Sequence, residues 1–137
     1  MATHQTPTAD FDISTVTELG QAEVSIKHPT TGAPTGATVT LAGPEHPQRK
    51  QLIFTRTRKL RASFQKTGKV QLDDPVDEEA DTIAFLAACT LGWTAIAEKG
   101  VAIPYSPQAA NDLYARVGWL RAQVAAALDE KENFIVA

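Results

Sequence analysis

Residues 76–98 read VDEEADTIAFLAACTLGWTAIAE, and this stretch decides the fold that the sequence predicts. As a helix it would be apolar around more than half of its circumference, which is typical of a core element. The side chains that give it this character are Ile83, Phe85, Leu86, Cys89, Trp93 and Ile96. The acids near its start complement the positive end of the helix dipole. We therefore expect a central helix from about residue 76 to residue 98, with Gly100 as its C-cap.

The residues that follow predict a second long helix. Ser106 and Pro107 form a typical start, with an N-cap residue followed by proline at the first helical position. Apolar residues then recur at spacings of four, three, four and four up to about residue 131; they are Leu113, Val117, Leu120, Val124 and Leu128. Gly118 interrupts this pattern, and we expect it to bend or split the helix.

The residues that precede the central stretch predict a strongly basic helix over residues 46–66. Pro47 suits the first helical position, and Ile53, Leu60 and Phe64 form one narrow apolar stripe. Eight basic residues and no acid lie between His46 and Leu72, whereas six acids lie within residues 73–81. The net charge of −3 is therefore a cancellation between two oppositely charged segments.

Nearer the N-terminus, residues 21–43 alternate as a β-hairpin does. Apolar residues alternate with polar neighbours in both halves of this stretch: Val24 and Ile26 in the first half, Val39 and Leu41 in the second. Residues 28–36 (HPTTGAPTG) form the connecting loop. Residues 1–20 are expected to form a flexible tail. The predicted fold is α+β: this antiparallel hairpin packs on a bundle of three or four helices in one domain, residues 21–137, whose helical core covers residues 76–137.

The residues that usually carry chemistry are few and scattered. His4, His28 and His46 lack the spacing of a metal pair, and the acids of residues 73–81 lack the pattern of a calcium loop. Cys89, the single cysteine, lies in an apolar context that favours a buried side chain over a nucleophile. We expect no catalytic activity, no cofactor and no bound metal. No apolar run is long enough to cross a membrane and no signal peptide opens the chain, which favours a reducing cytoplasm.

The basic helix is the polar feature that stands out, and three interpretations are open. Its cations could neutralise phosphates of a nucleic acid. They could be balanced within the chain by the acids of residues 73–81. They could also form a docking surface for an acidic or helical protein.

Several short motifs resemble the tail assembly chaperones of long-tailed bacteriophages. In the C-terminal half they are LGW at residues 91–93, the Gly-x-x-Ile-Pro-Tyr-Ser segment at 100–106, AAN at 109–111, GWL at 118–120 and QV at 123–124. An acidic stretch and Phe134 close this half, and the loop of residues 28–36 resembles the start of such proteins. The hairpin and the strongly basic helix depart from the simplest family members.

The resemblance implies a non-enzymatic protein of the host cytoplasm. Members bind the tape measure protein, keep its apolar helices soluble and help to recruit tail tube subunits; many also have a longer, frameshifted product. The expected client groove comprises Trp93, Ile96, Ile103, Tyr105, Leu113, Trp119 and Leu120, with a basic rim of Arg56, Arg58, Lys59 and Arg61. The alternatives are a small structural protein of the virion, in the tail or head–tail region, that associates through its hairpin, and a nucleic-acid binder.

Overall fold

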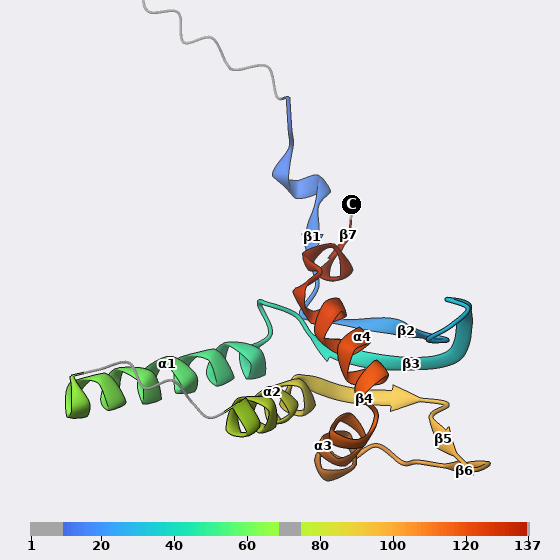
Figure 1. The fold of residues 1–137 in the computed structure, drawn as a ribbon. Helices are drawn as coiled ribbons and strands as arrows, with labels where there is room; N and C mark the ends of the chain where they lie inside the picture. The colour runs from blue at the N-terminus through green and yellow to red at the C-terminus, as the bar shows by residue number, and fades with distance from the viewer. Residues whose placement is uncertain (1–9, 69–74, 137) are drawn as a thin grey trace, which may run out of the picture.

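The protein has an α+β fold, as predicted (Figure 1). The computed structural model describes residues 10–68 and 75–136. The strands of these residues are β1 (Thr17–Glu18), β2 (Gln21–Lys27), β3 (Pro34–Ala42), β4 (Thr90–Thr94), β5 (Ala97–Glu98), β6 (Val101–Ala102) and β7 (Ile135–Val136). The helices are α1 (Pro47–Thr67), α2 (Pro75–Ala88), α3 (Pro107–Arg116) and α4 (Gly118–Asp129), with short 3₁₀ turns at Ile13–Thr15 and Lys131–Phe134.

The predicted hairpin is confirmed and forms two strands of a three-stranded antiparallel sheet. Strands β2 and β3 pair with Val24 opposite Val39 and Ala22 opposite Leu41, so these apolar side chains share one face. The connection is shorter than expected, since β3 already begins at Pro34 and the amide of His28 donates to the carbonyl of Ala33 at 2.8 Å. Helix α4 crosses the sheet in Figure 1, and its Val124 and Leu128 belong to the same buried core as Val39 and Leu41.

The predicted central helix is wrong beyond residue 88. Helix α2 ends at Ala88, and Thr90–Thr94 form β4, the third strand of the sheet, with Val39 opposite Trp93. β-Branched threonines and Gly92 weaken a helix here, and pairing with β3 satisfies the backbone instead. Helical periodicity cannot anticipate this outcome, because β3 lies about 50 residues away in the chain.

Gly100 likewise does not cap a helix. It forms, with Lys99, the two-residue turn between β5 and β6, where Glu98 pairs with Val101. Lys99 and Gly100 have φ of 52° and 79°, as the tight turn of a hairpin requires. Residues 76–136 are therefore a mixture of helices and strands rather than a helical core.

The C-terminal helix begins as predicted and splits at Gly118. The hydroxyl of Ser106 accepts a hydrogen bond from the amide of Ala109 at 3.0 Å and caps α3. Val117, with φ −111° and ψ 86°, lies outside the helical region and separates α3 from α4. Helix α3 packs beside α2, and the phenol of its Tyr114 lies 2.7 Å from the hydroxyl of Thr90, the first residue of β4, in the interior.

The two ends of the described chain are joined. Strand β1 pairs with β7, and the amide of Leu19 donates to the carbonyl of Phe134 at 2.7 Å. Gly43 lies against this junction so closely that a Cβ would be 2.9 Å from the Leu19 oxygen. The expectation of a flexible tail is therefore wrong for residues 17–20, which lack a periodic pattern of their own and are held by the far end of the chain; residues 1–9 lie outside the described part.

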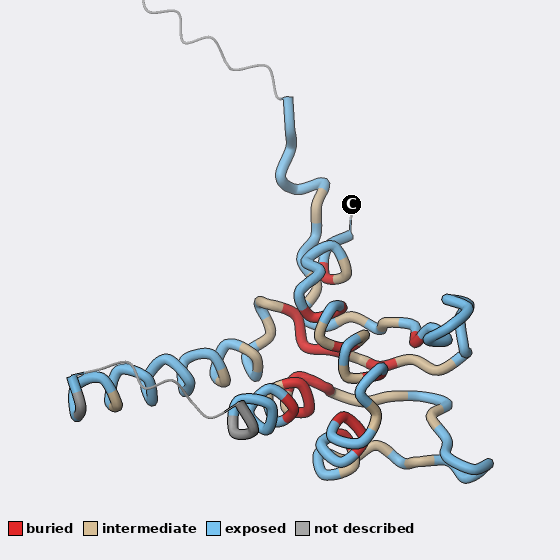
Figure 2. The backbone as a smooth tube through the Cα atoms, viewed as in Figure 1, coloured by how far each residue is buried: buried red, intermediate tan, exposed pale blue. Residues whose placement is uncertain are grey.

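The predicted basic helix is confirmed as α1, which extends away from the rest of the molecule (Figures 1 and 2). The ring of His46 accepts a hydrogen bond from the amide of Gln48 at 3.1 Å and caps its start. The first turns contact the body, whereas most of the helix is drawn as exposed in Figure 2. We call the described residues outside α1 the body.

Candidate protein-binding groove

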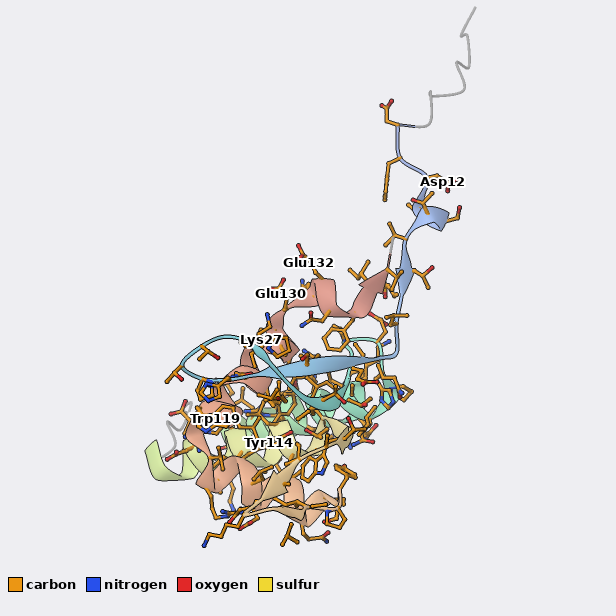
Figure 3. All side chains as sticks on the ribbon, turned by 90° about the vertical axis from the view of Figure 1, so that its right-hand side faces the viewer. Asp12, Lys27, Tyr114, Trp119, Glu130 and Glu132 are labelled. Carbon is orange, nitrogen blue, oxygen red and sulfur yellow. The ribbon has the colours of Figure 1, made fainter. Side chains whose placement is uncertain are left out.

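An apolar groove of about 450 Å³ opens where β5 and β6 meet the junction of α3 and α4. Its floor consists of the buried side chains of Ile26, Leu113 and Leu120. Ile96 and Ile103, which are half-buried, form one wall. Trp119 lines it from the first turn of α4, keeps 43% of its surface exposed and lies at the edge of the body in Figure 3. The groove therefore joins a buried core to an exposed aromatic ring.

Local geometry explains why these side chains converge. The amide of Ile103 donates to the carbonyl of Ile96 at 2.9 Å, which extends the β5–β6 hairpin and keeps the two isoleucines side by side. The break at Val117 redirects the chain, so that Leu113 from the end of α3 and Leu120 from the start of α4 contribute to the same floor. The β2–β3 hairpin adds Ile26 and Ala37 to the lining of the groove.

Ion pairs rather than a basic patch border the groove. The guanidinium of Arg116 lies 3.0 Å from Asp112 and 3.1 Å from Glu98, and it ties α3 to β5. The hydrogen bond to Asp112, and to a smaller extent the one to Glu98, raises the pKa of Arg116 above its ordinary value. Because these pairs are exposed, they contribute little to folding, but they give the groove a charged border.

Trp93 and Tyr105, both expected in the groove, support the structure behind its wall. Their rings meet edge to face at a centroid distance of 5.2 Å. The indole of Trp93 donates to the carbonyl of Ile103 at 2.8 Å, and the phenol of Tyr105 donates to that of Thr90 at 2.6 Å. Neither residue lines the groove, whereas the other five expected residues do: Ile96, Ile103, Leu113, Trp119 and Leu120.

The expected basic rim lies elsewhere. Arg56, Arg58, Lys59 and Arg61 are on α1, which extends from the body on the side away from β5 and β6 in Figure 1. The structure does not bring these cations to the groove, and they form a second, separate surface.

Sequence reasoning missed Ile26 and Arg116 as groove residues. Ile26 lines the groove because the β2–β3 hairpin packs on α4, and no local sequence pattern predicts this packing. Arg116 had a usable signal, since Asp112 precedes it by four residues in a predicted helix, the spacing of a helical ion pair.

The buried reactive groups support the core. Cys89 is fully buried, as expected, and burial raises the pKa of its thiol to about 11. Burial likewise raises the pKa of Tyr114 to about 12. Among the described residues there is no group of three or more potential metal-binding side chains. Of the histidines, His28 and His46 form local turn and cap contacts, and His4 lies outside the described residues.

No helix of the described residues is both long and apolar enough to span a bilayer. Comparison with protein-family models, curated proteins and solved structures found no significant match to this chain.

Proposed function

We propose that this chain is a non-enzymatic assembly chaperone of a long-tailed bacteriophage that holds an apolar helical segment of the tape measure protein in the groove beside Trp119. One observation carries the proposal: the groove is lined mainly by apolar side chains, from the buried Leu113 and Leu120 to the half-exposed Trp119. The sequence motifs that resemble this chaperone family supply the identity of the client.

The physical basis is helix-in-groove binding, in which affinity comes from apolar side chains inserted into a preformed pocket. A volume of about 450 Å³ accommodates more than one aliphatic side chain of a client helix. Tryptophan at the edge of such a pocket is a typical hot-spot residue, because its ring buries a large area at a low entropy cost. On this proposal, Arg116 and Glu98, which line the groove, orient the client through charge.

On this proposal the chain acts in the host cytoplasm. It keeps the long apolar helices of the tape measure protein from aggregating until tail tube subunits, its second partner, assemble around them. Its work is to bind and release, so the proposal requires neither a catalytic side chain nor a cofactor.

The test is co-expression of the chain with the tape measure protein of the same phage, measuring how much client stays soluble and co-purifies. We expect Trp119→Ala to weaken the complex by roughly thirtyfold, which corresponds to a hot spot of about 2 kcal/mol. The matched control is Phe11→Ala, since Phe11 is an exposed aromatic residue outside the groove, and it should leave the complex intact.

Tryptophan fluorescence then locates the contact. In a Trp93→Phe background, Trp119 is the one remaining tryptophan, and burial by the client should shift its emission to shorter wavelength. A wild-type chain that neither solubilises nor binds the client would rule the proposal out. A complex that is unaffected by Trp119→Ala would place the client on a surface other than the groove.

A second candidate function is a structural protein of the virion, and the position of β2 favours it. Strand β2 is an edge of the three-stranded sheet, and an edge strand can pair with a neighbouring subunit. Mass spectrometry of purified particles separates the two functions, because a chaperone leaves before the particle matures and a structural protein remains.

A further inference from the structure

We infer that α1 is a second docking surface, independent of the groove, and that its partner is an acidic amphipathic helix of another protein. We call Ile53, Leu60 and Phe64, with Thr57 between them, the arm stripe. The argument combines the exposure of this stripe with the charge around it, which the described residues leave unbalanced; Asp73 and Asp74 of the acidic segment lie outside the described part.

The base of α1 is firmly attached to the body. The guanidinium of Arg49 donates to the carbonyls of Ala42 and Leu128, each at 3.1 Å. The side-chain amide of Gln48 donates to the carbonyl of Ala88. About two turns further on, the guanidinium of Arg56 lies 4.9 Å from the centre of the Phe85 ring. These contacts fix the direction of α1 while its distal half extends outward (Figures 1 and 2).

The arm stripe has the spacing of a helix-packing seam. Its members follow one another at intervals of four, three and four residues, so they fall within a narrow sector of the helix surface. Ile53, Leu60 and Phe64 keep 47%, 55% and 51% of their surface exposed. The arm stripe matches one partner helix about three turns long. Phe54, which is 63% exposed, lies outside the stripe, about 100° around the helix from Ile53.

The charge on α1 selects the kind of partner. The helix contains seven basic residues and no acid. Of the ion pairs between described residues, the one that involves α1 joins Lys50 to Glu45. Glu79, an acid near the start of α2, pairs instead with Arg121 of α4 at 3.2 Å. Arg56 and Arg61 thus flank the arm stripe on its two sides without a described carboxylate to balance them.

These observations choose among the possible occupants. A second copy of α1 would bring two sevenfold-positive helices together, which like-charge repulsion opposes. A nucleic acid would neutralise the cations but would not cover Leu60 and Phe64. An acidic helix with apolar residues at the same spacing satisfies both features, because it buries the stripe and places its carboxylates beside Arg56 and Arg61.

The probe is a synthetic, end-capped 21-residue peptide with leucine at alternating intervals of three and four and glutamate on the flanking positions. The matched control is the same peptide with lysine in place of glutamate. We expect the acidic peptide to bind the full chain at least tenfold more tightly than the basic one, with an affinity that falls as salt rises.

Three variants assign the contact. The double variant Leu60→Ala/Phe64→Ala should weaken binding of the acidic peptide at least tenfold, and Arg56→Gln/Arg61→Gln should weaken it and reduce its salt dependence. Trp119→Ala should leave it unchanged, which keeps this test separate from that of the groove. The melting temperature of each variant checks that the body remains folded.

Three outcomes would overturn the inference. The first is equal binding of the acidic and basic peptides, and the second is binding of the acidic peptide that survives Leu60→Ala/Phe64→Ala. The third is that duplex DNA binds more tightly than the acidic peptide and is insensitive to Leu60→Ala/Phe64→Ala. That result would assign α1 to a nucleic acid.

Discussion

The body and helix α1, which we call the arm, contain the same apolar spacing, yet only the body buries it. Leu113, Val117, Leu120 and Val124 follow one another at four, three and four residues, and so do the members of the arm stripe. In the body, Leu113, Leu120 and Val124 are at most 5% exposed, whereas the arm-stripe residues Ile53, Leu60 and Phe64 remain about half exposed. The spacing identifies the apolar side chains of helices, in the body across the break between α3 and α4, but it does not say what covers them.

The difference arises from what surrounds each helix. Helices α3 and α4 have short connections to their neighbours and pack against α2 and the sheet. Helix α1 contacts the body through its first turns, and its distal half carries a charge that the described residues leave unbalanced. The body therefore stabilises the fold, whereas the arm stripe remains about half exposed.

The largest contrast is expected from matched leucine truncations. Leu128→Ala, in the core, should lower the free energy of unfolding by about 2–5 kcal/mol, because it removes buried contacts and leaves a cavity. Leu60→Ala, on the arm, should change it by less than about 0.5 kcal/mol. Urea denaturation followed by circular dichroism measures both. A loss of more than about 2 kcal/mol for Leu60→Ala would mean that the arm packs on the body in solution.

How far the sequence determines the structure depends on whether the signal is local in the chain. Helix α1, the start of α3 at Ser106 and the hairpin were predictable because their signals are local: a proline, a cap or a run of alternating residues. Strand β4 was not, since Thr90–Thr94 become a strand through pairing with β3. The sequence pointed to five groove residues, but not to the β5–β6 hairpin that holds Ile96 beside Ile103, because that arrangement exists only after the chain has folded.

Alkaline pH should destabilise the body through two buried groups. Burial raises the pKa of Cys89 from about 9 to about 11 and that of Tyr114 from about 10 to about 12, so the folded state favours their neutral forms. Their stabilising contribution is complete below pH 9. It is lost as pH rises from 9 to 11 for Cys89 and from 10 to 12 for Tyr114, on the order of 2 kcal/mol each.

Variants separate the two contributions. In Cys89→Ala, the free energy of unfolding should begin to fall at about pH 10 rather than at about pH 9, relative to the variant's own value at pH 7. In Tyr114→Phe, this fall should be less steep above pH 10. Leu60→Ala should follow the wild-type profile, since both groups lie in the body. Denaturation midpoints between pH 7 and pH 12 provide the measurement, and a profile that stays flat to pH 12 would contradict the assignment.

The smallest effects are expected from the helix caps, one in each region. Ser106→Ala removes the acceptor for the Ala109 amide at the start of α3 and should lower global stability by about 1 kcal/mol, because α3 is packed in the body. At the far end of α1, Gly68 has φ 68° and donates its amide to the carbonyl of Phe64 at 2.7 Å. Gly68→Ala strains this left-handed position at a similar local cost of about 1 kcal/mol.

Loss of either cap weakens its own helix, but the two losses should differ in whether they lower the stability of the whole fold. Because the distal half of α1 lies outside the core, Gly68→Ala should speed amide hydrogen exchange around Phe64 while leaving the urea midpoint unchanged. Ser106→Ala should instead lower the midpoint. Equal shifts of the urea midpoint for the two variants would mean that the end of α1 unfolds together with the body. If only Ser106→Ala moves it, the distal arm is a separate unit of stability, able to rearrange around a partner helix at no cost to the fold that carries the groove.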